Sequence, residues 1–170
     1  PKGLKHDVIL FGRNRIGWSI LRALKDAGKK FLVVDYNPMT IDDLITEKIP
    51  CIYGDAGDIE ILERLNMKKT KLIISTISDM ADNLLLLRKF KEVNKKGIAF
   101  VTASQVDEAL MLYKEGADYV ILPHFLGGEY VTLLMKQAAN KEKLQKTRLK
   151  HLTELKERQR AGHEHPRHEK

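Results

Sequence analysis

Residues 6–35 read HDVILFGRNRIGWSILRALKDAGKKFLVVD, and this stretch decides the fold. The run 7–11, apolar after its first residue, stops at Gly12, which predicts a short strand followed by a tight turn. From Gly17 onward apolar residues recur at helical spacing, and a second apolar run, 31–34, ends on an aspartate. The stretch therefore predicts a strand, a glycine turn, a helix and a second strand that stops at an acid.

This order of elements is typical of the first half of a unit that binds nucleotides. The turn lets backbone N–H groups and the helix N-terminus face a phosphate, while the acid accepts hydrogen bonds from ribose hydroxyls. Asp35 follows Gly17 by 18 positions, close to the roughly 20 expected for that acid. We therefore expect a nucleotide-binding crevice; a structural turn in an α/β protein is the alternative.

The turn departs from the pattern GxGxxG at its middle position. Asn14 stands where the second glycine would be, between Gly12 and Gly17. Asparagine tolerates a positive φ better than most residues, so the turn can still form. Its side chain, however, occupies the place where a pyrophosphate would come closest. An adenine nucleotide is expected, with AMP, ADP or ATP favoured over NAD(H).

The composition fits one folded domain with an appendage, because the chain has 170 residues and is 43% hydrophobic. The longest apolar runs, such as 84–87 and 119–122, are far shorter than the ~20 residues of a membrane-spanning helix, so no membrane span is expected in this chain. The single cysteine, Cys51, excludes an internal disulfide, fits a reducing cytoplasm and is predicted to be a small core residue.

The positive charge is concentrated near the end of the chain. The formal net charge is +7, and residues 141–170 contain ten Lys or Arg and five Asp or Glu. The rest of the chain is close to neutral, which argues against a basic nucleic-acid groove, and no nucleic-acid partner is expected. A metal site at His163, His165 and His168 is the weaker alternative to a disordered polar tail, and no metal is expected.

Beyond Asp35, short apolar runs alternate with helical patterns. Further strands are predicted at Cys51–Tyr53, Leu72–Ser75, Ile98–Thr102 and 119–122, and further helices at 39–47, 58–65, 79–93 and 106–115. Gly28 and Gly116 stand where a helix would need a left-handed cap. Six strands alternating with five helices predict an α/β fold with a doubly wound, six-stranded parallel sheet.

Three parts are expected along the chain: a nucleotide-binding domain at 1–126, a C-terminal helical extension at 127–160 and a disordered polar tail at 161–170. Gly127 and Gly128 begin a long helical pattern. The later leucines of the extension form only a narrow apolar stripe on a polar helix. The extension is either solvated and frayed or packed on a partner.

The series of motifs is more specific than the glycine turn alone. The motifs are Gly12-Arg13-Asn14-Arg15-Ile16-Gly17, Val34-Asp35-Tyr36-Asn37-Pro38, Gly54-Asp55-Ala56 after the third strand, Thr76 with Asp79 and Asn83 after the fourth, and Glu115-Gly116-Ala117-Asp118-Tyr119-Val120 before the last. Over about residues 5–138 this series resembles the RCK domain, also called TrkA-N or KTN. That family supplies cytoplasmic regulators of potassium channels and of cation/proton antiporters.

The resemblance implies a Rossmann-like fold that forms homodimers and holds a nucleotide at the carboxyl ends of the strands. It implies that Gly12, Arg13, Asn14 and Gly17 surround the phosphates, that Asp35 holds the ribose, that Asp55 and Ala56 border the adenine, and that Thr76 lies near the phosphates. Arg15, Ile16, Tyr36, Asn37 and Ile77 complete the implied nucleotide-binding set. From the residues alone, Asp55 and Thr76 fit a turn aspartate and a strand-end threonine equally well.

The second regulatory domain that commonly follows in channel-type members is missing here, and a charged tail stands in its place. This arrangement resembles the cytoplasmic C-terminus of a Kef-type cation/proton antiporter, which implies a location on the cytoplasmic side of the membrane and a transmembrane partner. Pro1 is not an initiator methionine, which fits a piece of a longer protein. A regulatory domain of a potassium channel or Trk-type uptake system is the alternative.

We do not expect an enzyme. A dehydrogenase needs a proton donor or acceptor beside the cofactor, and His124 is the one candidate base at a strand end. A small NAD-dependent oxidoreductase and an interaction protein with an empty crevice stay as alternatives. A homodimer is also expected, because the apolar residues 84–87, Phe90 and Val93 are more than one face of a free helix needs.

Overall fold

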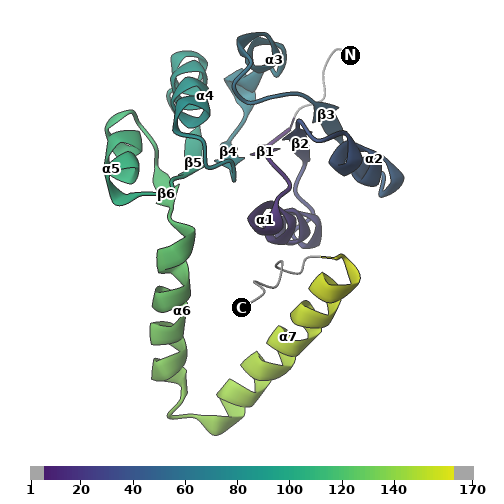
Figure 1. Ribbon diagram of the computed structural model, residues 1–170, viewed down its shortest axis with the longest axis vertical. Helices are drawn as coiled ribbons and strands as arrows, with labels where there is room; N and C mark the ends of the chain where they lie inside the picture. The colour runs from purple at the N-terminus through teal and green to yellow at the C-terminus, as the bar shows by residue number, and fades with distance from the viewer. Residues whose placement is uncertain (1–5, 163–170) are drawn as a thin grey trace, which may run out of the picture. The chain divides into compact units, whose positions relative to one another are not determined.

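Six strands form one parallel sheet in the computed structural model, which describes residues 6–162 (Figure 1). The strands are β1 Val8–Phe11, β2 Phe31–Asp35, β3 Cys51–Tyr53, β4 Leu72–Ser75, β5 Ile98–Thr102 and β6 Tyr119–Ile121. Their order in the sheet is β3-β2-β1-β4-β5-β6, and every neighbouring pair is parallel. The doubly wound, Rossmann-like prediction is therefore confirmed.

The helices follow the strands in alternation. They are α1 Arg15–Asp26, α2 Pro38–Thr46, α3 Ile59–Arg64, α4 Met80–Val93, α5 Val106–Lys114, α6 Pro123–Gln137 and α7 Lys141–Arg160, with a short 3₁₀ helix η1 at Met67–Lys69. Asparagine or aspartate side chains cap the N-termini of α1 to α4. These residues favour an N-cap because a short side-chain oxygen can accept from the first unpaired N–H groups of a helix.

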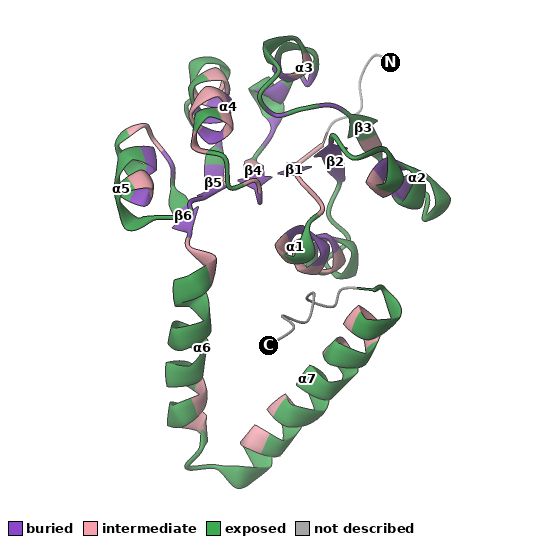
Figure 2. Cartoon of the chain, in the orientation of Figure 1, coloured by how far each residue is buried: buried purple, intermediate pink, exposed green. Residues whose placement is uncertain are grey.

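The sheet has a separate apolar core on each face. Successive side chains of a strand point to opposite faces, so Ile9 and Phe11 pack with α3, α4 and α5, whereas Val8 and Leu10 pack with α1 and α2. All residues of β1 and β2 are buried, as expected for parallel strands covered on both sides. Figure 2 shows these strands in purple inside the layers of helices.

Several element boundaries differ from the sequence prediction. Helix α1 begins at Arg15 because Asn14 caps it, ahead of the expected start at Gly17. Helix α6 begins at Pro123, whose fixed φ suits the first turn of a helix, and the glycines expected to start it lie inside it. The short η1 was not predicted. Cys51, expected in the core, is only partly buried because β3 is an edge strand.

Gly28 and Gly116 follow the last turns of α1 and α5 with φ values of +60° and +102°. A side chain is disfavoured in this left-handed region, so the two predicted glycine caps are confirmed.

The chain divides into two compact units, 1–123 and 124–170. The first holds the sheet with α1 to α5. In the second, α6 and α7 are linked by a hydrogen bond from Thr147 Oγ1 to Gln137 Oε1 at 3.2 Å, and neither helix has a buried residue (Figure 2). Within residues 6–162, no helix is both long and apolar enough to cross a membrane. His163, His165 and His168 lie outside the described residues.

Gly17 provides a test of how α1 is held against β1. A Cβ atom at this position would collide with the carbonyl oxygen of Gly12, so Gly17→Ala should lower the free energy of unfolding by about 2 kcal/mol. Gly127→Ala is the matched control, because its Cβ meets no atom within 4 Å and alanine favours a helix. Urea unfolding measures both, and an unchanged midpoint for Gly17→Ala would contradict the close packing.

Candidate functional site

The loops that follow β1, β2, β3 and β4 come together at the carboxyl edge of the sheet. The strand order changes direction between β1 and β4, and ligands of doubly wound sheets bind outside this switch point. The predicted nucleotide-binding residues all lie in these four loops or in the residues that flank them. The topology therefore brings the predicted set to one edge of the first unit.

The loop after β1 is packed tightly against the loop after β4. Gly12 has a φ of +85°, and a side chain there would press on the Thr76 hydroxyl. Thr76 is 2% exposed and its Oγ1 donates to the Gly12 carbonyl oxygen at 2.9 Å. Thr76 thus joins the two loops, as its place at the end of β4 allows.

Asn14 is the N-cap of α1 and forms a second link between the same loops. Its Oδ1 accepts from the N–H groups of Ile16 at 3.1 Å and Gly17 at 3.0 Å. Its Nδ2 donates to the Thr76 carbonyl oxygen at 2.7 Å. The side chain therefore satisfies two of the backbone donors with which a helix N-terminus binds phosphate.

Asp35 holds the loops after β1 and β2 at the end of its strand. It is 8% exposed, and its Oδ2 accepts from the Arg13 N–H at 2.7 Å, whereas Oδ1 accepts from the Asn37 N–H at 2.8 Å. Each carboxylate oxygen has two lone pairs, so each retains capacity for a further donor such as a ribose hydroxyl. The carboxylate is thus both anchored and able to accept a ligand.

The Arg13 side chain reaches α2. Its Nη1 lies 3.3 Å from Asp43 Oδ2 and its Nη2 lies 3.3 Å from Glu47 Oε1. Glu47 also pairs with Lys25 at 3.5 Å. Within residues 6–162, Arg13 Nε is buried without a hydrogen-bond partner. Sequence reasoning missed Asp43 and Glu47, because nothing in their spacing indicates that a residue 30 or more positions earlier reaches them.

The loop after β3 adds carboxylates to this edge. Asp55 Oδ1 accepts from the Gly57 N–H at 2.8 Å, and Ala56 is 3% exposed. A Cβ atom added to Gly57 would meet the carboxylates of Asp82 and Asp55, so these acids are close neighbours. Burial first, and then the charges of Asp79 and Asp55, raise the pKa of Asp82. The sequence offered no signal for Asp82.

The other predicted residues line the same loops in different environments. Tyr36 is exposed, and Asn37 caps α2 by accepting from the Met39 N–H at 3.0 Å. Arg15 is exposed and Ile16 is partly buried in the first turn of α1. Ile77 is partly buried, so the predicted set combines groups exposed to solvent with groups that hold the loops.

Asn83 supports the loop after β4 from inside the fold. It is 1% exposed, and its Nδ2 donates to the carbonyl oxygens of Ile77 and Thr102, both at 2.8 Å. These bonds link α4 to the carboxyl ends of β4 and β5. Asn83 therefore holds the loop after β4 in place, although it was not in the predicted binding set.

The carboxyl edge offers groups that can bind a ligand. Among residues 6–162 no group of three or more His, Cys, Asp or Glu side chains is arranged to hold a metal ion. His124, the candidate base, lies in the second unit. The groups at the carboxyl edge are carboxylates, amides and backbone N–H donors, which suit recognition of ribose and phosphate.

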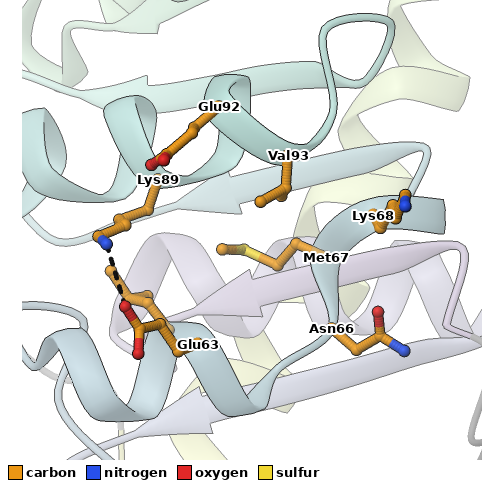
Figure 3. A pocket seen from close by; sticks show the side chains of 8 residues that line it. Glu63, Asn66, Met67, Lys68, Lys89, Glu92 and Val93 are labelled. Atoms are coloured by element: carbon orange, nitrogen blue, oxygen red, sulfur yellow. Dashed lines mark hydrogen bonds and ion pairs between the residues drawn. The ribbon is translucent and has the colours of Figure 1, made fainter.

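A separate hollow of about 280 Å³ lies between α3, η1 and the end of α4 (Figure 3). It combines apolar residues such as Met67 with Glu63 and Lys89, whose Oε1 and Nζ lie 3.1 Å apart. Because η1 leads into β4 and α4 leads into β5, the hollow is near the amino ends of these strands. It is therefore distinct from the carboxyl-edge loops.

A doubly wound parallel sheet with a glycine turn after β1 and an acid at the end of β2 defines a Rossmann-like α/β domain. The model of the TrkA-N domain family matches residues 8–123. The chain therefore belongs to the TrkA-N family, as the sequence motifs predicted.

Two relatives are potassium-transport proteins. The chain is 29% identical over 130 residues to Potassium channel protein 1 of Methanocaldococcus jannaschii. The aligned region covers 75% of this chain and 39% of that relative. It is 31% identical over 111 residues to the glutathione-regulated potassium-efflux system protein KefC of Escherichia coli, covering 65% of this chain and 18% of that protein. The chain thus spans less than half of either relative.

Solved structures share the fold. The TrkA-N domain of the Escherichia coli inner membrane protein ybaL has a TM-score of 0.72 and 19% identity, covering 79% of this chain and 98% of that one. The AMP-bound Kef CTD of Shewanella denitrificans has a TM-score of 0.63 and 19% identity, covering 88% and 91%. The NAD-bound GsuK channel has a TM-score of 0.63 and 22% identity, covering 72% and 22%.

Proposed function

We propose that this chain is a nucleotide-sensing regulatory domain of a monovalent cation/proton antiporter. The observation that carries the proposal is the Asp35 carboxylate, anchored by two backbone N–H groups beside the N-terminus of α1. It is further supported by membership of the TrkA-N family and by similarity to a potassium-efflux system protein. Regulation of a potassium channel is the second candidate, supported by the similarity to Potassium channel protein 1.

The proposed ligand is an adenine nucleotide. Its ribose hydroxyls would donate to Asp35 and its phosphate would lie at the N-terminus of α1, with the adenine towards Asp55 and Ala56. Solved relatives of the same fold hold AMP, ADP or NAD. The proposal needs no catalytic residue, and we assign none.

AMP, ADP and ATP are preferred over NAD(H) in this proposal. Asn14 Oδ1 accepts from the Ile16 and Gly17 N–H groups, which a pyrophosphate would otherwise bind. A ligand phosphate must compete with that side chain, and a dinucleotide has to place its pyrophosphate at this point. AMP, ADP or ATP would need to place only its first phosphate there, and the further phosphates of ADP and ATP could extend towards solvent.

The signal would pass through the loops that the ligand touches. Asn14 and Thr76 bridge the loops after β1 and β4, so displacement of Asn14 changes that bridge and the start of α4. A ligand can shift an equilibrium only by the difference in its affinity for the two states. The membrane portion that receives this conformational shift would be a separate part of the same protein or complex. This domain would lie on the cytoplasmic side of the membrane.

A homodimer completes the proposal. Leu86, Leu87 and Phe90 of α4 are buried within the first unit, which accounts for much of the apolar surface of this helix. Exposed apolar side chains remain on the neighbouring α5, where Leu110 is 60% and Met111 is 51% exposed. An exposed apolar surface of this kind fits an interface between two copies of the chain.

Adenine nucleotides should raise the melting temperature of the chain, and Asp35→Ala should remove most of the gain because it deletes the ribose acceptor. Thermal unfolding with AMP, ADP, ATP, NAD and NADH measures the effect. Asp58→Ala is the matched control, because Asp58 caps α3 by accepting from the Glu60 N–H at 2.8 Å and is outside the predicted binding set. This variant should keep the gain in melting temperature that the nucleotide gives. The proposal fails if none of the five nucleotides changes the melting curve.

Asn14→Gly should shift the preference towards NAD by roughly tenfold in the ratio of dissociation constants, because it frees two N–H donors. Isothermal titration with AMP and NAD gives this ratio. Asn140→Gly is the control, because it removes the equivalent N-cap of α7. An equal ratio in the wild type and Asn14→Gly would contradict the role of Asn14.

The chain should be dimeric at high concentration, and Leu110→Ser combined with Met111→Ser should favour the monomer by removing apolar contact area. Light scattering after size-exclusion chromatography measures the mass. Ile45→Ser is a control at an exposed apolar residue of α2. A wild-type chain that stays monomeric at all concentrations would rule out the dimer.

A further inference from the structure

The loop after β4 is held by asparagine side chains from two helices. Asn14, the N-cap of α1, donates through Nδ2 to the Thr76 carbonyl oxygen at 2.7 Å. Asn83, in the first turn of α4, donates through Nδ2 to the next carbonyl oxygen along the chain, that of Ile77, at 2.8 Å. These two consecutive carbonyl groups therefore link the N-terminus of α1 to α4.

Asn83 also bonds to the end of β5. Its Nδ2 donates to the Thr102 carbonyl oxygen at 2.8 Å, so both hydrogens of the amide nitrogen are used. The side chain is 1% exposed, and its Oδ1 is buried without a hydrogen-bond partner within residues 6–162. A buried acceptor without a partner costs stability, so the two donor bonds are what this amide contributes.

The bond to β5 is continued to β6 by a single peptide group. The Thr102 carbonyl shares its planar peptide group with the Ala103 N–H, which donates to the Ile121 carbonyl oxygen at 3.0 Å. A rotation of this group changes both bonds together. Ile121 ends β6, and α6 begins two residues later at Pro123, so the bonds of Asn83 are connected to the end of the first unit.

We propose that Asn83 is a positioning residue that couples nucleotide binding at the loop after β4 to the ends of β5 and β6. The inference rests on the proposed nucleotide-binding function and names a route by which that site acts on the rest of the domain. The strength of such a coupling is the change in nucleotide affinity that accompanies the change in the bonds of Asn83.

The coupling begins at the N-terminus of α1. A ligand phosphate there competes with the Asn14 side chain for the helix N–H groups and so alters the bond from Asn14 to the Thr76 carbonyl. The Ile77 carbonyl is the next one along the chain, so the change reaches the segment that Asn83 holds. The same amide nitrogen then passes it to Thr102.

NMR spectra of the ¹⁵N-labelled chain with and without AMP test this coupling. Saturating AMP should shift the amide signals of both Ile77 and Ala103 in the wild type. Asn83→Ala removes both donor bonds, so the change at Ile77 should remain and most of the change at Ala103 should be lost. Because the loop is then less well positioned, the Kd for AMP should rise about fivefold.

Asn83→Ser is the milder variant, for use where Asn83→Ala does not fold. Its single hydroxyl donor cannot serve two carbonyl oxygens at once, so part of the change at Ala103 should be lost.

Asn94→Ala is the matched control. Asn94, the C-cap of α4, also donates through Nδ2 to two carbonyl oxygens, those of Met67 at 3.0 Å and Thr70 at 2.7 Å. These bonds lie in η1 and before the amino end of β4, away from the carboxyl-edge loops. The control should keep the changes at Ile77 and Ala103 and the wild-type Kd for AMP.

A wild-type chain in which AMP shifts Ile77 but not Ala103 would overturn the inference. A change at Ala103 that survives Asn83→Ala in full would also overturn it, because the effect would then reach β5 without Asn83. Loss of that change in Asn94→Ala would do the same, since any weakening of α4 would then suffice. If neither AMP, ADP, ATP, NAD nor NADH binds, the proposed function itself fails; binding without a response at Ala103 refutes only the role of Asn83.

Discussion

The close approach of α1 to the end of β1 is the constraint on which the arrangement of the carboxyl-edge loops depends. Gly17 lies against the Gly12 carbonyl oxygen with no room for a side chain between them. This contact places the N-terminus of α1 over the end of the strand, where its N–H groups face the switch point of the sheet. The same approach brings Asn14 within hydrogen-bonding distance of the loop after β4.

Three side chains then connect the loops at this edge. Asp35 binds the backbones of the loops after β1 and β2, and Thr76 and Asn14 bind the loops after β1 and β4. A nucleotide that displaces or shares any of these bonds acts on several loops together. A binding domain can therefore transmit the presence of its ligand without a catalytic step, which is the behaviour proposed for a regulator of transport.

Acidic side chains are close neighbours at the carboxyl edge of the sheet. The pKa of Asp82 is raised first by burial and then by the charges of Asp79 and Asp55. Arg13, one of two arginines in the glycine turn after β1, is paired with Asp43 and Glu47 of α2. A helix N-terminus with its backbone donors favours anions, and Asn14 already accepts from two of these donors in α1.

Local patterns were enough for much of this molecule. Apolar runs and glycine positions predicted all six strands and a doubly wound parallel sheet, because parallel strands buried on both faces are almost continuously apolar. The spacing of Gly17 and Asp35 identified the proposed phosphate and ribose positions. Asn14 could also have been predicted as the N-cap of α1, because asparagine favours that position. In the sequence, this residue was compared only with the glycine of the motif. The partners of Arg13, the link from Asn14 to Thr76 and the proximity of Asp82 to Asp55 were decided only by the tertiary structure, because each joins residues far apart in the chain whose distance depends on how the loops pack.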